Sequence, residues 1–106
     1  MQYMVELEHR AESCIAGDPA GNHARLFAQL KDYAADKGLQ IQGGWLFPVG
    51  HRMWFVVDAE NGHDVQQLFF DAKVHLWSAI SVNPVNDYDS FLANILLPAQ
   101  RGDSKE

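Results

Sequence analysis

Residues that could bind a metal recur in this chain at the ends of predicted elements. His9 closes a strand-like segment, Cys14 follows it, and His51 and His75 stand at the starts of two later strand-like segments. Imidazole nitrogens and thiolates are the ligands that zinc, copper, iron and nickel prefer. The sequence therefore predicts a divalent transition-metal site with His9 and His51 as primary ligands. His75 and Cys14 are further candidate ligands, and Glu8 is a candidate ligand or outer partner that orients an imidazole.

The elements that must position these side chains follow the order β-α-β-β-α-β, with one more helix at the end. Alternating or short continuous apolar runs between turn residues predict the strands, and apolar residues at helical spacing predict the helices. The predicted strands are residues 2–9, 39–47, 51–59 and 73–85, and the predicted helices lie within 17–38, 60–72 and 87–97.

The helix ends carry recognisable signals. Asp18 is expected to cap the first helix, with Pro19 at its first position and Gly38 in the left-handed conformation at its end. Pro98 is expected to stop the last helix. The apolar stripe of the second helix consists of Val65, Leu68, Phe69 and Ala72.

This order of elements matches a ferredoxin-like arrangement, an α+β fold with an antiparallel four-stranded sheet in the strand order 4-1-3-2. In that topology the end of strand one meets the starts of strands three and four. His9, His51 and His75 would therefore converge at one edge of the sheet, with Cys14 and His23 above that edge.

Side-chain alternation divides the three converging histidines between the two faces of the sheet. His9 and His51 share parity with the apolar residues that must lie beneath the helices, whereas His75 shares parity with Trp77 on the open face. His9 and His51 thus form the primary pair. The alternative is that these polar residues merely collect at strand ends and that Cys14 is a small, partly buried side chain.

The open face of the sheet offers a second kind of site. The members that could do chemistry are Glu6, Glu8, Arg52, Trp54, His75 and Trp77. A carboxylate or the imidazole would act as the base, the guanidinium would hold an anionic oxygen, and the two indoles would wall a flat ligand. This arrangement predicts a metal-free monooxygenase or isomerase that acts on a small aromatic or polyketide-like ligand.

Two exposed tryptophans would also form an apolar patch, which a second copy packed sheet against sheet would cover. The sequence thus predicts a symmetric homodimer. In a third reading Glu6 and Arg52 are a cross-strand ion pair, the tryptophans only pack the interface, and the protein is a non-catalytic assembly module. Whether the chain is an enzyme stays open among these three.

Composition and charge limit the number of domains and the classes of partner that the chain could have. The chain has 106 residues, 47% of them hydrophobic, which predicts one domain over 1–97 and a disordered polar tail over 98–106. The net charge of −6 and the absence of a basic cluster argue against nucleic acids and anionic membranes. Without a signal peptide, a spanning segment or a second cysteine, the expectation is a soluble cytoplasmic protein in which Cys14 stays reduced or binds metal.

Three stretches together resemble the dimeric α/β-barrel superfamily: "MQYMVELEHRAESC", "GGWLFPVGHRMWFVVDAEN" and "AISVNPVNDYDSFLANI". The resemblance covers residues 1 to about 97. It implies a ferredoxin-like subunit that dimerises through its sheet. Members of that superfamily include cofactor-free monooxygenases, haem-degrading enzymes and muconolactone-type isomerases. They share no catalytic set, so the resemblance assigns no catalytic residue to this chain.

Overall fold

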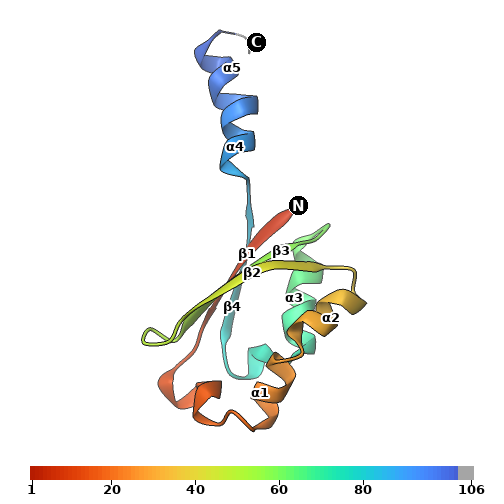
Figure 1. The fold of residues 1–106 in the computed structure, drawn as a ribbon, viewed down its shortest axis with the longest axis vertical. Coiled ribbons are helices and arrows are strands. Elements are labelled where there is room, and N and C mark those ends of the chain that lie inside the picture. Colours follow the sequence, from red (N-terminus) through yellow and green to blue (C-terminus); the bar gives the residue numbers. More distant parts are fainter. Residues whose placement is uncertain (103–106) are drawn as a thin grey trace.

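The structure, a computed structural model that describes residues 1–102, is an α+β fold with an open four-stranded antiparallel sheet. The strands are β1 (Gln2–Glu8), β2 (Gln40–Phe47), β3 (Arg52–Asp58) and β4 (Ala79–Val85). The helices α1 (Asn22–Phe27), α2 (Leu30–Asp36) and α3 (Gly62–Asp71) lie over one face of the sheet (Figure 1). Two short 3₁₀ turns, η1 (Ala11–Ser13) and η2 (Ile15–Gly17), precede α1, and a third, η3 (Val74–Leu76), follows α3.

The strand order is β2-β3-β1-β4, and every neighbouring pair is antiparallel. Strand β1 is central: its Val5 and Leu7 are completely buried, while Glu6 and Glu8 point to the other face. The stripe of α3 packs onto this buried face, as its pattern predicts, through Val65, Leu68, Phe69 and Ala72. Each such large apolar side chain contributes about 1.5–3 kcal/mol when fully buried.

The antiparallel pairing of β1 with β3 brings distant parts of the chain together at one edge of the sheet. Glu8 is the register partner of Arg52, and beyond this pair the backbone N–H of His9 donates to the carbonyl oxygen of His51 at 3.1 Å. The end of β1 therefore lies beside the start of β3, the arrangement on which a shared site depends.

The predicted first helix is wrong in its beginning and in its continuity. Asp18 does not cap it: the N-cap of α1 is Gly21, and the carbonyl oxygen of Asp18 instead accepts the N–H of Gly21 in a turn, 2.9 Å away. Because Gln29 leaves helical geometry at φ −97°, ψ 11°, the segment divides into α1 and α2. Gly38 ends the segment at φ +74°, as predicted.

The predicted fourth strand begins too early. Lys73 adopts a left-handed conformation at φ 62°, the η3 turn follows, and β4 starts only at Ala79. The turn resets the alternation on which the face assignment of His75 and Trp77 was based. Trp77 is consequently buried in the core beneath the helices, only 6% exposed, and does not lie on the open face.

The chain ends in a helical arm, defined here as residues 86–102, that points away from the sheet (Figure 1). It runs through α4 (Tyr88–Phe91), the π-helical segment η4 (Leu92–Leu96) and α5 (Leu97–Gln100). Pro98 does not stop the helix, because it lies in the first turn of α5, where proline is tolerated.

No residue of the arm is buried. The radius of gyration is 17.2 Å, whereas a compact chain of this length has about 13 Å.

Residues 98–100 of the predicted tail are helical, because they belong to α5, and residues 103–106 lie outside the described part of the chain. Among residues 1–102, no helix combines the length and the apolar character that crossing a bilayer demands.

Candidate metal centre

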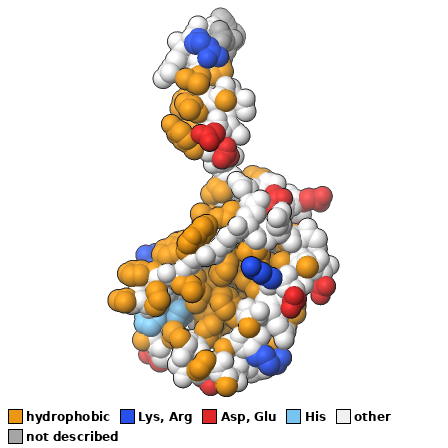
Figure 2. All heavy atoms as spheres, in the orientation of Figure 1, with side chains coloured by type: hydrophobic (Ala, Val, Ile, Leu, Met, Phe, Trp, Pro, Cys, Tyr) orange, Lys and Arg blue, Asp and Glu red, His pale blue; other side chains and the backbone are white. Residues whose placement is uncertain are grey.

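His9, Cys14 and His51 come together at the edge of the sheet where β1 ends and β3 begins. One possible ligand atom from each, two imidazole nitrogens and the Cys14 Sγ, lie within 4.8 Å of one another. The sequence predicted that His9 and His51 meet, and Cys14, one of the further candidates, joins them. Figure 2 shows histidine side chains exposed among hydrophobic ones near the turn between β2 and β3.

The backbone fixes each member of this group in a different way. His9 follows β1 directly and is anchored by its hydrogen bond to His51. His51 occupies the β2–β3 turn at φ 55°, a left-handed conformation that a residue other than glycine adopts at a cost of about 1–2 kcal/mol. Cys14 has an extended conformation between η1 and η2, and its N–H donates to the carbonyl of Ala11 at 3.2 Å.

His9 is the least accessible member, only 8% exposed. Neither of its ring nitrogens has a hydrogen-bond partner within residues 1–102, and the same is true of Nδ1 of His51. A buried polar atom without a partner is uncommon in folded proteins and calls for an explanation such as a bound ion. A metal on these rings would supply that explanation.

Burial, and to a smaller extent the neighbouring His51 imidazole, lower the pKa of His9 below its ordinary value. His9 is therefore neutral at pH 7, which leaves an unprotonated nitrogen with a lone pair. The neutral ring is the form that ligates a metal.

The spacing of the three ligand atoms is close to that of a metal site but wider. Bonds of about 2.0 Å to nitrogen and 2.3 Å to sulfur place one sulfur and two nitrogens of a tetrahedral site about 3.3–3.5 Å apart. Closing from 4.8 Å requires movements of about 1 Å. Cys14 and His51 both lie in turns and can make them, whereas His9 is fixed at the strand end.

A small cavity of about 110 Å³ adjoins the three side chains and has an almost entirely apolar lining. Ile15, Leu46 and Met53 are among the residues that line it, beside His9 and His51. A metal held here would therefore face a small, mainly apolar space in addition to its protein ligands.

Glu8 does not orient the His9 imidazole. Successive residues of a strand point to opposite faces, so Glu8 projects from the open face while His9 points beneath the helices. His75 is not part of the group either. It lies exposed in η3, and its ring packs on that of Phe70 with 4.7 Å between centroids.

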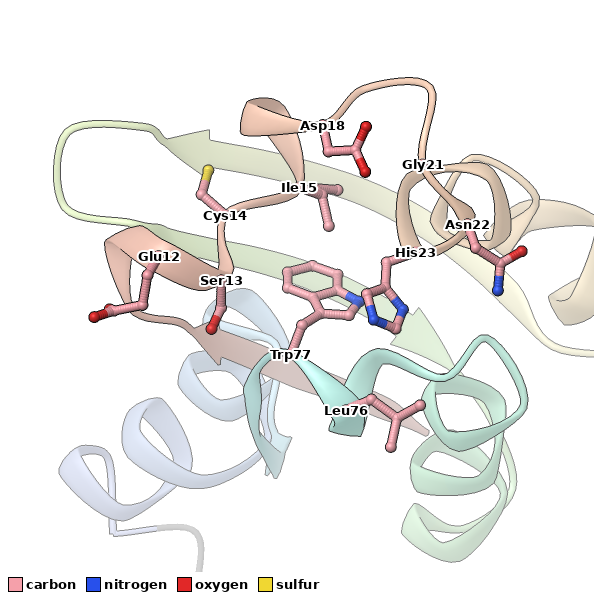
Figure 3. Close-up of a pocket in the computed structure, with 10 residues that line it drawn as sticks. All are labelled: Glu12, Ser13, Cys14, Ile15, Asp18, Gly21, Asn22, His23, Leu76 and Trp77. Carbon is pink, nitrogen blue, oxygen red and sulfur yellow. The ribbon is translucent and has the colours of Figure 1, made fainter.

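His23 lies on α1 and lines a separate pocket of about 350 Å³. In Figure 3, Cys14 stands at one end of this pocket and His23 at the other, with the Trp77 ring between them. His23 is exposed and lies outside the group that could hold a metal. The first turn of α1 thus contributes to a neighbouring pocket rather than to the metal centre.

On the open face, Glu6 and Arg52 form the cross-strand ion pair that the third reading of the sequence expected, with 2.7 Å between Oε2 and Nη2. The guanidinium also lies over the ring of Trp54, 5.9 Å from its centroid. The second tryptophan of this face is Trp45, not Trp77. It is the register partner of Trp54 and is 58% exposed.

Trp45 was missed because β2 has an irregularity between Ile41 and Gly43 that shifts its alternation by one residue. The two glycines before Trp45 are the sequence signal that could have revealed it, because glycine inside a strand often marks a bulge.

Comparison of the chain with models of known protein families gave no match, and comparison with curated proteins gave none either.

Proposed function

We propose that this protein binds a divalent transition metal through His9, Cys14 and His51. The observation that carries the proposal is the approach of the three ligand atoms to within 4.8 Å around an imidazole whose nitrogens are buried without partners. The donor set favours zinc, copper, iron or nickel over magnesium or calcium, which prefer oxygen ligands.

Three protein ligands leave a fourth tetrahedral position, the pattern typical of metal sites that bind or transform a small molecule. The apolar cavity beside the group supports this interpretation. The metal-free reaction on the open face is less well supported, because His75 and Trp77 lie elsewhere and Arg52 is paired with Glu6.

The experiment is a cobalt(II) titration of the full chain, purified without an affinity tag. Cobalt bound by a thiolate gives a sulfur-to-metal charge-transfer band, and tetrahedral cobalt gives intense visible bands. We expect both in the wild type, no charge transfer in Cys14→Ser, and weak binding in His51→Ala. The matched control is His63→Ala, an exposed histidine on α3 outside the group. Absence of saturable binding in the wild type, or equal binding by all four proteins, would overturn the proposal.

We also propose that two copies associate, as the resemblance to the dimeric α/β-barrel superfamily implies, and that the arm takes part in the contact in addition to the sheet. The arm supports this, because its large apolar side chains are 36–68% exposed and gather along one flank in Figure 2. They are Tyr88, Phe91, Ile95, Leu96 and Leu97. The arm points away from its own sheet and none of its residues is buried against it, so covering these side chains requires another surface, which a second copy of the chain would supply.

Half-burying each of these side chains is worth about 1 kcal/mol, and two exchanged arms would bury ten of them. Sedimentation velocity tests the association: we expect a dimer for the wild type and a monomer for Ile95→Asp. Ala93→Asp, at an exposed alanine on the same arm, is the control and should remain dimeric. A monomeric wild type at micromolar concentration would refute the association without affecting the metal centre.

A further inference from the structure

We propose that the metal centre is selective for copper(I) and that the thioether of Met53 is its fourth ligand. This inference rests on the metal centre proposed above. It deepens that proposal by naming the metal and by adding a ligand that was not among the candidates from the sequence. The observation behind it is that Met53 lines the small cavity together with the three metal-binding side chains.

The pairing of β1 with β3 places Met53 beside the two histidines. Met53 is the register partner of Leu7. The hydrogen bond from the N–H of His9 to the carbonyl oxygen of His51 continues this pairing two residues further along. Met53 therefore follows His51 by two residues and is the diagonal neighbour of His9. Diagonal neighbours in an antiparallel pair are about 7–8 Å apart, which is within reach of a long side chain.

Met53 also projects to the same face of the sheet as the two histidines. Its side chain is 7% exposed and belongs to the core beneath the helices, where the ring of His9 contacts the ring of Trp77. A methionine side chain is unbranched and has three rotatable bonds, so its sulfur can turn toward a bound ion without a shift of the backbone. A fourth donor is thus available on the side of the sheet where the other three lie.

Sulfur in two forms gives this donor set its preference among metals. Thiolate and thioether sulfurs are soft ligands that favour copper(I), and two histidines with one cysteine and a weaker methionine are typical of copper sites. Zinc sites are built instead from thiolate, imidazole and carboxylate ligands. Zinc and cobalt therefore gain little from Met53 and leave the fourth position open, whereas copper(I) engages the thioether.

The first experiment measures copper(I) binding by the full chain, purified without an affinity tag, in competition with a chromogenic copper(I) chelator in oxygen-free buffer. We expect saturable binding by the wild type and an affinity about tenfold lower in Met53→Leu, which removes the thioether at nearly constant volume. The cobalt(II) affinity of Met53→Leu should stay within about twofold of the wild type. The matched control is Met4→Leu, on the open face of β1, which should bind copper(I) like the wild type.

The second experiment identifies the ligand directly and does not depend on the stability of a variant. In selenomethionine-labelled wild type, X-ray absorption at the copper edge should show a copper–selenium contribution. Met53→Leu should remove this contribution and Met4→Leu should retain it.

The outcomes separate this inference from the proposed function. Cobalt binding without copper(I) binding would overturn the inference and leave the metal centre standing. The absence of a copper–selenium contribution in the labelled wild type, or equal copper(I) affinity in the wild type and Met53→Leu, would also overturn it. Failure of both metals to bind would overturn the proposed function itself.

Discussion

Replacing His9 with leucine should make the metal-free protein more stable while removing its ability to bind metal. In the native chain both ring nitrogens of His9 are buried without partners. A protein selected for stability alone would place a hydrocarbon side chain at this position, so the variant separates the demands of binding from those of folding.

The magnitude follows from two opposing effects. A buried donor or acceptor without a partner costs about 1–3 kcal/mol, so the two nitrogens together cost roughly 4 kcal/mol. Leucine loses the edge-on contacts of the imidazole with His51 and Trp77, at centroid distances of 5.2 and 5.4 Å. Those two contacts are worth roughly 2 kcal/mol together. The net gain in the free energy of unfolding is therefore about 2 kcal/mol, which corresponds to a rise in Tm of about 10 °C.

Urea unfolding and calorimetry of the metal-free proteins measure this gain, and the same measurements with zinc test the second half of the prediction. Zinc at a hundred times its Kd should stabilise the wild type by about 2.7 kcal/mol and His9→Leu not at all. The control is His63→Leu, an exposed position where the change should stay within about 0.5 kcal/mol. If metal-free His9→Leu is less stable than the wild type by more than about 1 kcal/mol, the His9 nitrogens are satisfied and the reasoning is wrong.

Three further predictions concern pH, the open face and the backbone. Because the pKa of His9 is lowered on folding, the unfolded chain binds the proton first, so the free energy of unfolding should fall as the pH drops below about 6.5. Urea melts of the metal-free protein across pH 5–8 would measure this, and His9→Leu should flatten that part of the profile. Glu6→Gln should change the free energy of unfolding by less than about 1 kcal/mol. Solvent screens the Glu6–Arg52 pair, because the Arg52 side chain is 43% exposed and that of Glu6 is 33% exposed. A larger loss in chemical denaturation would show that this pair contributes more than a solvent-screened contact. Lys73→Gly should stabilise the protein by up to about 1 kcal/mol, because glycine adopts the left-handed conformation at φ 62° without strain, and an unchanged or lower Tm would contradict this.

Local sequence patterns predicted the elements whose signals are repeated over several residues. The alternation in β1 and the stripe of Val65, Leu68 and Phe69 in α3 each specify which face must be buried, and the structure buries those faces. Gly38 was predictable from its own residue type, because glycine adopts the left-handed conformation that ends a helix without strain.

The errors arose where a local pattern was compatible with more than one structure. The run from Val74 to Ile80 is apolar enough to be a strand throughout, yet a left-handed Lys73 begins a turn there. Moving the strand start to Ala79 reversed the environment of Trp77 from an open face to the core. The bulge in β2 placed Trp45 on the open face by the same kind of shift.

The sequence by itself determined which residues could act as ligands, and that β1 and β3 would bring His9 and His51 to one edge if they paired antiparallel. Only the tertiary structure decided that the third member is Cys14 and not His75, and that the last helix extends from the sheet instead of packing on it. The physical reason is that strand pairing is specified by a pattern repeated along both strands, so it survives small errors in the boundaries. The position of a loop cysteine or of a terminal helix depends on a few turn dihedrals and on packing with distant residues, and neither is encoded in the nearby sequence.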